Sequence, residues 1–445
     1  MELILPFSFN DFPEDVQIRI LSFLNPWELE LFARTSTRFL ALCRDDERLW
    51  FLKCRRRWGS QTQIQNWGGR KISYRHLYHL LEKYENLIGF WHLDDYMTIS
   101  QSLSPSLVCF EWGSFYITGY MISPSKCGGY GVTKKPFLWI TATSNGKGLN
   151  YLDTSGSVSL TEKDMSRLDS EKLRSELILV DTELSVGSYF YLSVWENPQF
   201  FEFRKRLSTR NGREEYESVY KSPPDGLMTQ IYETLGSKLS VTGGKKSKRE
   251  RTGERQRERE KWRRVLLWDS KQFQKLTEYS PAPSRPLQGL WKGICPDRSL
   301  NLYLVSYREE WGLFYCKKVD GSCTLDTYRD TVFTASCSAS IQYPFSTEEE
   351  STYNTRVHVR PRVEANQAGQ NHATISSDHH NVLRIFYAHS GYNPYPSSSS
   401  GNSDDIDGRI WLYADGTFGF GFLRDDCIVD MRPVIENGRL LDTMV

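Results

Sequence analysis

Residues 12–24 read FPEDVQIRILSFL and combine a helix start with a dense run of apolar residues. Pro13 suits the first turn of a helix, where its missing N–H would have no partner, and the two acids that follow it suit the positive end of the helix dipole. Apolar residues then occur at Val16, Ile18, Ile20, Leu21, Phe23 and Leu24. They cover more than one narrow stripe, so we expect one face to fill a local core and to leave Ile18 and Leu21 for a partner.

More short helices are predicted downstream of this stretch. Asn25-Pro26 is a turn signal, and the patterns after it favour helices at 27–33, 35–43, 45–50, 51–58 and 73–84. Ser73 is the expected N-cap of the last helix. Three short helices within about 40 residues form a bundle that is marginal alone, and an exposed apolar face on it would require a partner.

The order of these residues resembles the F-box, a helical module of ubiquitin-ligase substrate receptors. The matching positions are Pro13, Glu14, Ile20, Leu21, Leu24, Leu29, Ser36, Arg38, Leu49 and Trp50. The chain departs from the pattern with Phe12 in place of a leucine and with Phe39 where many members have a tryptophan. Both exchanges keep bulk and apolarity.

The resemblance implies that residues 6–52 form an F-box domain and that residues 53–85 form linker helices. The F-box would bind a Skp1-type adaptor and, through it, a cullin. The chain would then be a non-catalytic substrate receptor of an SCF ubiquitin ligase, with an unknown target protein bound by the rest of the chain. The residues expected to contact the adaptor are Pro13, Glu14, Ile18, Ile20, Leu21, Leu24 and Leu29.

After residue 85 the pattern changes to short β-rich runs separated by Gly, Ser and Pro. Two of these runs, 87–93 and 287–294, share Gly-x-Trp, which indicates an internal duplication or two strands that open the two parts of one sheet. The clearest hairpin is 410–423, where Asp415-Gly416 is a strong two-residue turn signal. Many short strands with turns between them predict an antiparallel sandwich or barrel.

The β-rich part of the chain also resembles known families. Gly-x-Trp on an opening strand is similar to the lipocalin-type barrel, and the order of F-box, linker helix and interrupted β-domain is similar to the F-box proteins whose substrate domain is a closed β-barrel. We therefore expect an α+β chain whose mainly antiparallel, lipocalin-like barrel is built from residues 86–205 and 285–440. In that group the barrel presents a pocket or rim to a short segment of the target, but no residues of such a pocket are assigned by this sequence.

Residues 206–284 do not fit the barrel and are expected to form a charged insert that is partly mobile. Between Lys245 and Arg264 there are eleven Lys or Arg and four Glu, a local net charge of +7. This run favours a solvated insert first and a nuclear import signal second; a nucleic-acid patch is least supported, because no regular alternation of aromatic and basic residues supports base stacking. A second polar stretch, 346–380, predicts a mobile loop whose histidines lack a Cys or acid at metal-ligand spacing.

Composition argues against several classes of function. The 56 Lys and Arg and 55 Asp and Glu leave the 445-residue chain near neutral, without the global field of a nucleic-acid-binding protein. The nine cysteines are scattered without zinc-type spacing, which favours reduced thiols in the cytoplasm or nucleus. Neither a signal peptide nor an apolar span of roughly 20 residues is present, which argues against a membrane.

No catalytic constellation, cofactor site or metal site stands out in the sequence. Acid pairs such as Asp425-Asp426 are adjacent, and adjacent side chains on a strand point apart. The leading hypothesis is therefore the non-catalytic adaptor. The alternatives are a small-ligand-binding β-barrel with an interaction module at its N-terminus, and an enzyme whose site the sequence does not reveal. A barrel interior filled by side chains would exclude a buried ligand.

Overall fold

The computed structural model describes residues 9–93, 107–125, 129–153, 177–184, 189–193, 271–277, 279–319, 331–360, 381–391, 408–436 and 438–444. Most of the predicted insert, including Lys245 to Arg264, and the second half of the predicted loop 346–380 lie outside these residues. The chain divides into two compact units, which are described separately. The first comprises Met1–Ile88, Glu111–Gly119 and Pro136–Lys271, and the second comprises Gly89–Phe110, Tyr120–Lys135 and Gln272–Val445.

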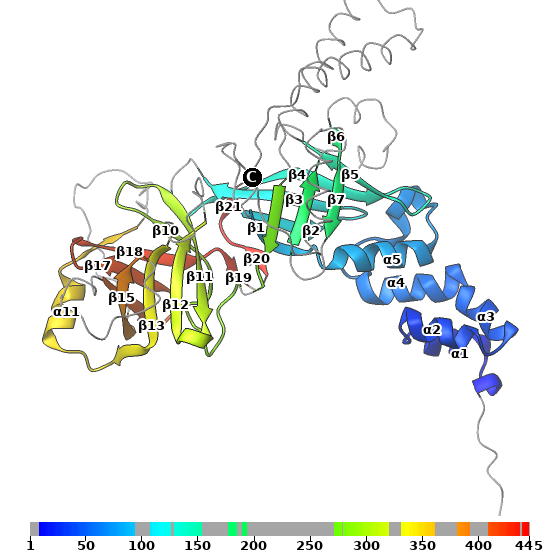
Figure 1. Cartoon of the computed structure of the whole chain (residues 1–445), viewed down its shortest axis with the longest axis horizontal. Helices are drawn as coiled ribbons and strands as arrows, with labels where there is room; N and C mark the ends of the chain where they lie inside the picture. The colour runs from blue at the N-terminus through cyan, green and yellow to red at the C-terminus, as the bar shows by residue number, and fades with distance from the viewer. Residues whose placement is uncertain are drawn as a thin grey trace, which may run out of the picture. The chain divides into compact units, whose positions relative to one another are not determined.

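The first unit begins with short helices at the places where the sequence predicts them (Figure 1). They are α1 (Glu14–Leu21), α2 (Pro26–Ala33), α3 (Thr37–Arg44), α4 (Phe51–Trp58) and α5 (Tyr74–Glu85). A 3₁₀ turn covers Phe9–Asp11 and a π turn covers Asp46–Trp50. Ile64–Arg70 is a 3₁₀ segment interrupted by a kink at Trp67, Gly68 and Gly69. We refer to residues 9–58, with α1 to α4, as the helical head.

Hydrogen bonds explain where two of these helices begin. At α2, the side chain of Asn25 accepts a bond from the N–H of Glu28 at 2.8 Å, and the Glu28 carboxylate accepts one from the N–H of Asn25 at 2.7 Å, which is a capping box. At α5, Ser73 occupies the expected N-cap position but makes no cap bond. The carboxylate of Asp46 takes that role and accepts the first two N–H groups of α5, each at 2.9 Å.

Several strands outside the barrel form antiparallel ladders of their own. In the first unit, β5 (Gly148–Leu152) pairs with the end of β4 (Val132–Ala142) and with β6 (Ile178–Leu179), and β7 (Asp181–Leu184) pairs with β8 (Tyr189–Ser193). In the second unit, β1 (Gly89–Leu93) pairs with β2 (Leu107–Trp112) and with β9 (Lys271–Lys275). The remaining short strands are β3 (Ile117–Pro124), β19 (Ile435–Glu436), β20 (Arg439–Leu440) and β21 (Thr443–Met444). The last of these, β21, pairs with β4 in parallel.

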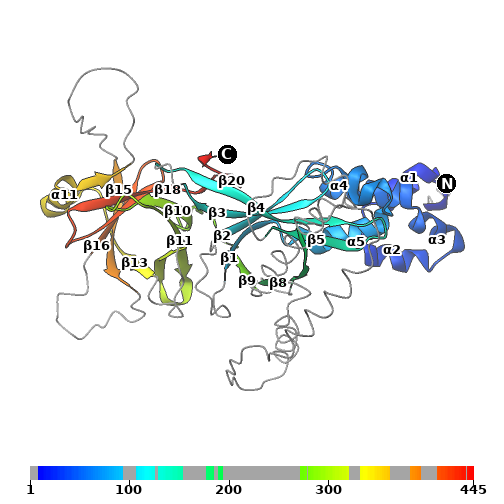
Figure 2. The ribbon, with the colours of Figure 1, turned by 90° about the horizontal axis from the view of Figure 1, so that it is seen from above.

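The second unit contains a closed antiparallel barrel, which Figure 2 shows from above. Its strands are β10 (Gly289–Ile294), β11 (Leu300–Arg308), β12 (Leu313–Lys318), β13 (Thr331–Gln342), β15 (Val382–Ser390), β16 (Gly408–Tyr413), β17 (Phe418–Phe422) and β18 (Cys427–Pro433). Each pairs with the next, and β18 returns to β10 through Trp291↔Pro433, Lys292↔Arg432 and Gly293↔Met431. The short strand β14 (Val357–Val359) adds to β18 in parallel. The fold class is α+β with a closed barrel, as predicted.

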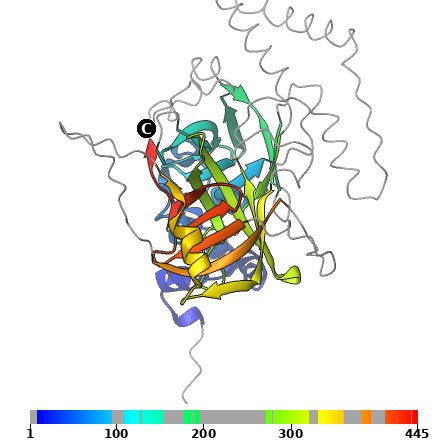
Figure 3. The same ribbon diagram turned by 90° about the vertical axis from the view of Figure 1, so that its left-hand side faces the viewer.

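Alternating positions on the barrel strands fill its interior with apolar side chains. Buried members of this cluster include Trp291, Tyr303, Phe314, Phe333, Phe386, Phe418 and Phe420. The outer faces are covered too. The cluster of Trp411 and Tyr413 packs against α11 (Thr347–Asn354), seen in front of the strands in Figure 3, and Leu290 and Leu302 pack against residues of β1 and β2. The packed interior leaves no room for a ligand buried inside the barrel, which argues against that form of the ligand-binding alternative.

The barrel differs from the expectation in its strand membership. It closes within residues 289–433, and the strands between 89 and 193 are not part of it. The two Gly-x-Trp strands, β1 and β10, open two different sheets, and their glycines share a positive φ of 115° and 127°. At Gly289 a Cβ would lie 2.8 Å from the carbonyl oxygen of Tyr279, so only glycine fits there.

Two further expectations need correction. The end of the predicted insert 206–284 contains β9, which pairs with β1. The predicted mobile loop 346–380 begins with α11 and β14, because Ser346 caps the helix by accepting the N–H of Glu349, and Glu349 forms a largely buried ion pair with Arg409 at 3.0 Å.

Candidate functional site

A group of large apolar side chains is exposed on the helical head. Ile20, Phe23, Trp27 and Leu31 are 41%, 64%, 63% and 46% exposed, and we call them the apolar patch. Ile20 lies in the last turn of α1, and Phe23 lies two residues after its end. Trp27 and Leu31 are four residues apart on α2 and therefore share one side of that helix. The guanidinium carbon of Arg56 lies 3.5 Å from the centroid of the Phe23 ring and borders the patch with a positive charge.

The apolar patch is supported by a buried core and by a buried lysine. Leu49 and Trp50 are buried in the head, and the indole N–H of Trp50 donates to the carbonyl of Cys43 at 2.9 Å. Lys53 is buried, and its ammonium donates to the carbonyls of Ser22 and Leu24, just after α1 ends. Burial lowers the pKa of Lys53. Its contacts fix the chain at the point where the patch turns from α1 into α2.

The structure separates the seven residues predicted to contact an adaptor into two groups. Pro13, Glu14 and Ile20 are exposed and Leu24 is half-buried, whereas Ile18, Leu21 and Leu29 are buried. The expectation that Ile18 and Leu21 are left over for a partner is wrong, since these two residues face inward with Gln17 on α1.

The sequence reasoning missed Phe23, Trp27 and Leu31 as surface residues. The available signal was the four-residue spacing of Trp27 and Leu31 on a helix that already buries Leu29 on its other side.

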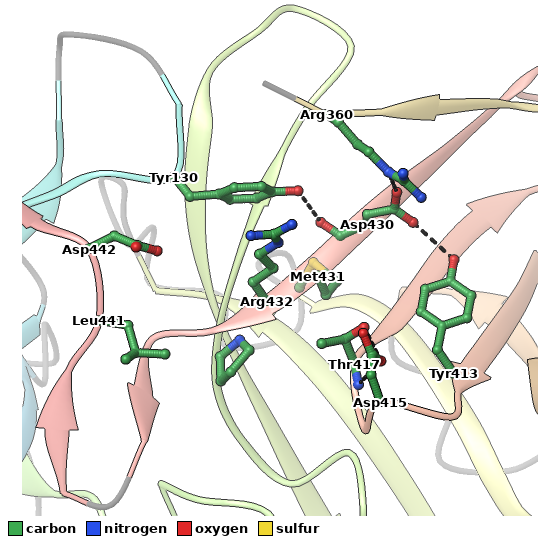
Figure 4. Close-up of a pocket in the computed structure, with 11 residues that line it drawn as sticks. Tyr130, Arg360, Tyr413, Asp415, Thr417, Asp430, Met431, Arg432, Leu441 and Asp442 are labelled. Atoms are coloured by element: carbon green, nitrogen blue, oxygen red, sulfur yellow. Dashed lines mark hydrogen bonds and ion pairs between the residues drawn. The ribbon is translucent and has the colours of Figure 1, made fainter. Parts of the chain in front are cut away.

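A second candidate site is a cavity in the second unit, which we call the barrel pocket (Figure 4). Its volume is about 410 Å³. Its lining residues are Tyr130, Arg360, Tyr413, Asp415, Thr417, Asp430, Met431, Arg432, Pro433, Leu441 and Asp442. The lining is rich in charged groups, in contrast to the apolar patch.

Asp430 organises one wall of the barrel pocket. This buried carboxylate accepts hydrogen bonds from the Tyr413 hydroxyl at 2.9 Å and from Nε of Arg360 at 2.5 Å, and it lies 2.9 Å from Nδ1 of His358. Burial by itself would raise the pKa of Asp430, but the bonds and charges of His358 and Arg360 outweigh it and lower the pKa. The carboxylate is therefore held ionised, and it orients Arg360 at the pocket.

Another ion pair fixes the opposite wall. The ammonium of Lys292, which is fully buried on β10, lies 2.7 Å from the carboxylate of Asp442 and donates to the carbonyl of Leu441 at 3.2 Å. Burial lowers the pKa of Lys292, and the bond to Asp442 opposes that effect. The C-terminal segment is thus tied to the barrel where it lines the pocket.

Sequence reasoning did not find this pocket. The sequence predicts His358 to lie in a loop without metal-ligand partners, and its partner Asp430 lies 72 residues away in the chain. The structure also brings together no group of three or more His, Cys, Asp or Glu suited to a metal within the residues it describes. Across the same residues, no helix has the length and apolar character that crossing a bilayer demands.

Comparison with known proteins agrees with the geometry of the head. The F-box-like family matches residues 9–56, which include the whole apolar patch. The F-box protein At3g12350 of Arabidopsis thaliana is 37% identical over 444 residues, which cover 98% of this chain and 97% of that protein. The similarity therefore extends through the strands as well as the helices. This chain belongs to the F-box protein family.

Proposed function

We propose that this chain is the substrate-receptor subunit of an SCF-type ubiquitin ligase. The helical head would bind a Skp1-type adaptor and, through it, a cullin, while the barrel unit would bind a target protein. Other subunits would transfer ubiquitin. The chain would act without chemistry of its own, because tethering raises the effective concentration of target lysines near the conjugating enzyme.

The apolar patch is the observation that carries this proposal. Soluble proteins seldom leave several large apolar side chains open on neighbouring segments unless a partner covers them. Here they lie inside the F-box match, on helices whose core is already filled by other residues. Covering the ring of Phe23 or Trp27 contributes about 2 kcal/mol by area alone, so a few such contacts supply a useful affinity.

The affinity of the purified full chain for a purified Skp1-type adaptor tests the proposal, for example by isothermal titration calorimetry. We expect Trp27→Ala to weaken binding about 30-fold, which corresponds to about 2 kcal/mol, and the double change with Phe23→Ala to weaken it further. Both side chains are exposed in the free chain, so its melting temperature should stay nearly the same.

Trp311→Ala is the matched control, because Trp311 is also exposed (51%) but lies between two barrel strands. It should leave adaptor binding unchanged. Absence of binding by the wild-type chain, or equal affinity of the Trp27→Ala and Trp311→Ala variants, would rule out this role for the apolar patch.

A further inference from the structure

We propose that the barrel pocket binds the carboxylate of an Asp or Glu side chain in a segment of the target protein, with Arg432 as its ion-pair partner. This inference rests on the proposed function, since it assigns a class of target to the barrel unit. The proposed carboxylate belongs to a side chain within an acidic segment of the target, and the terminus of the target chain is not required.

Arg432 is the first element of the site. It is exposed on β18, and no carboxylate of the described residues pairs with it. Its guanidinium lies 4.8 Å from the centroid of the Tyr130 ring. This stacking holds the group at the pocket without neutralising its charge, which leaves its planar donors available for a carboxylate.

Arg360 supplies a second set of donors. Its Nε is bonded to Asp430, and its two terminal nitrogens have no partner among the described residues. Burial and the charge of Asp430 raise the pKa of Tyr130 to about 12, while Arg432 and Arg360 act in the opposite direction. Figure 4 shows the guanidinium of Arg432 beside the Tyr130 ring and that of Arg360 beside Asp430, and both residues line the pocket.

The ion pairs of the lining indicate where an anionic group of a ligand would bind. Asp430 is compensated by Arg360, and Asp442 is compensated by Lys292. Arg432 is the cation left over in the lining, among the residues that the structure describes. Asp415 lies on an exposed turn and accepts bonds from the N–H and hydroxyl of Thr417. Its charge at the rim disfavours a doubly charged phosphoryl group, so a carboxylate fits better.

A library of head-to-tail cyclic octapeptides provides the probe, because cyclic peptides carry no terminal charge. One position is fixed as Glu, Gln or phosphoserine, and the others are mixed. The libraries are enriched on the full chain bound to its adaptor and are read by mass spectrometry. We expect Glu peptides to be enriched about tenfold over Gln peptides on the wild type, and this preference to disappear in Arg432→Gln.

Arg424→Gln is the matched control, because Arg424 is exposed on the turn between β17 and β18 but does not line the pocket. It should keep the preference for Glu. The inference would be overturned if Arg432→Gln enriched Glu peptides over Gln peptides as strongly as the wild type does, or if the wild type itself did not enrich Glu peptides over Gln peptides. Stronger enrichment of the phosphoserine peptides would show that the ligand group is not a carboxylate. Adaptor affinity is measured on the same samples, so a failure of the proposed function is seen separately from a failure at the pocket.

Discussion

The helical head and the barrel unit treat large apolar side chains in opposite ways. Helices of eight residues give the head too little surface to cover its own apolar residues, so Phe23 and Trp27 remain exposed. The closed barrel instead buries aromatic residues on the inner side of its strands and covers much of the outer side as well. The comparison teaches that one chain can carry two surfaces of different physical kind: an apolar one on the head and a charged one at the barrel pocket.

The sharpest test of this contrast is the removal of a barrel tryptophan. Trp291 is buried, its ring centroid lies 4.7 Å from that of Phe418, and its N–H donates to the carbonyl of Leu287 at 2.7 Å. Trp291→Ala should lower the free energy of unfolding by about 4 kcal/mol, because it leaves a cavity and loses a buried bond. Chemical denaturation measures this change. Adaptor affinity should stay within twofold; a parallel loss of affinity would contradict the independence of the two regions.

A smaller effect is expected from the buried carboxylate of the pocket. Asp430→Asn should cost about 2 kcal/mol at pH 7, since Arg360 and Tyr413 lose a charged acceptor. The pKa of Asp430 is lowered in the folded chain, so its ionised form contributes stability above the ordinary value of 3.8, and this contribution is lost as the pH falls through the lowered pKa.

Unfolding curves recorded between pH 7 and pH 3 should therefore show the wild type and Asp430→Asn converging below about pH 4. Asp415→Asn, on the exposed turn, should change stability much less at every pH. A gap between the wild type and Asp430→Asn that keeps its full size at the acidic end would show that the carboxylate is not held ionised by its neighbours.

The smallest effect concerns the head alone. Asn25→Ala removes the capping box of α2 and should destabilise the head by about 1 kcal/mol. Amide hydrogen exchange would show faster exchange in the first turn of α2 and no change in the barrel strands. Asn25→Asp retains a capping oxygen and should restore most of the protection; equal exchange in all three proteins would mean that the cap contributes little.

The helices of the head were predictable because their signals are local. Pro13 lies directly before α1, at its N-cap, and Asn25-Pro26 marks the start of α2. The exposure of each side chain was harder to predict. α1 has apolar residues on more than one side, so its pattern alone does not say which side faces the core. The structure buries Ile18 and exposes Ile20, the reverse of the expected assignment for Ile18.

In the barrel, too, features set by neighbouring residues were predictable from the sequence, whereas features set by distant residues were not. Asp415-Gly416 predicted the hairpin of β16 and β17, and the two strands pair from Leu412↔Phe418 onward. Strand membership was not predictable, because closure depends on β18 meeting β10 more than 100 residues earlier in the chain. The pocket combines Tyr130 with residues from 360 to 442, so no single stretch of sequence contains its pattern.

The carboxylate of Asp46 has a consequence for where this F-box ends. Asp46 lies inside the family match, which stops at residue 56, yet it caps α5, which begins at Tyr74. Trp50 and Trp58 both contact the ring of Tyr78 on that helix, with centroids 5.5 Å and 5.0 Å apart. The packed helical unit therefore extends beyond the residues of the F-box-like match. A fragment cut at the end of the match would retain the apolar patch while losing the helix that closes the opposite end of the bundle.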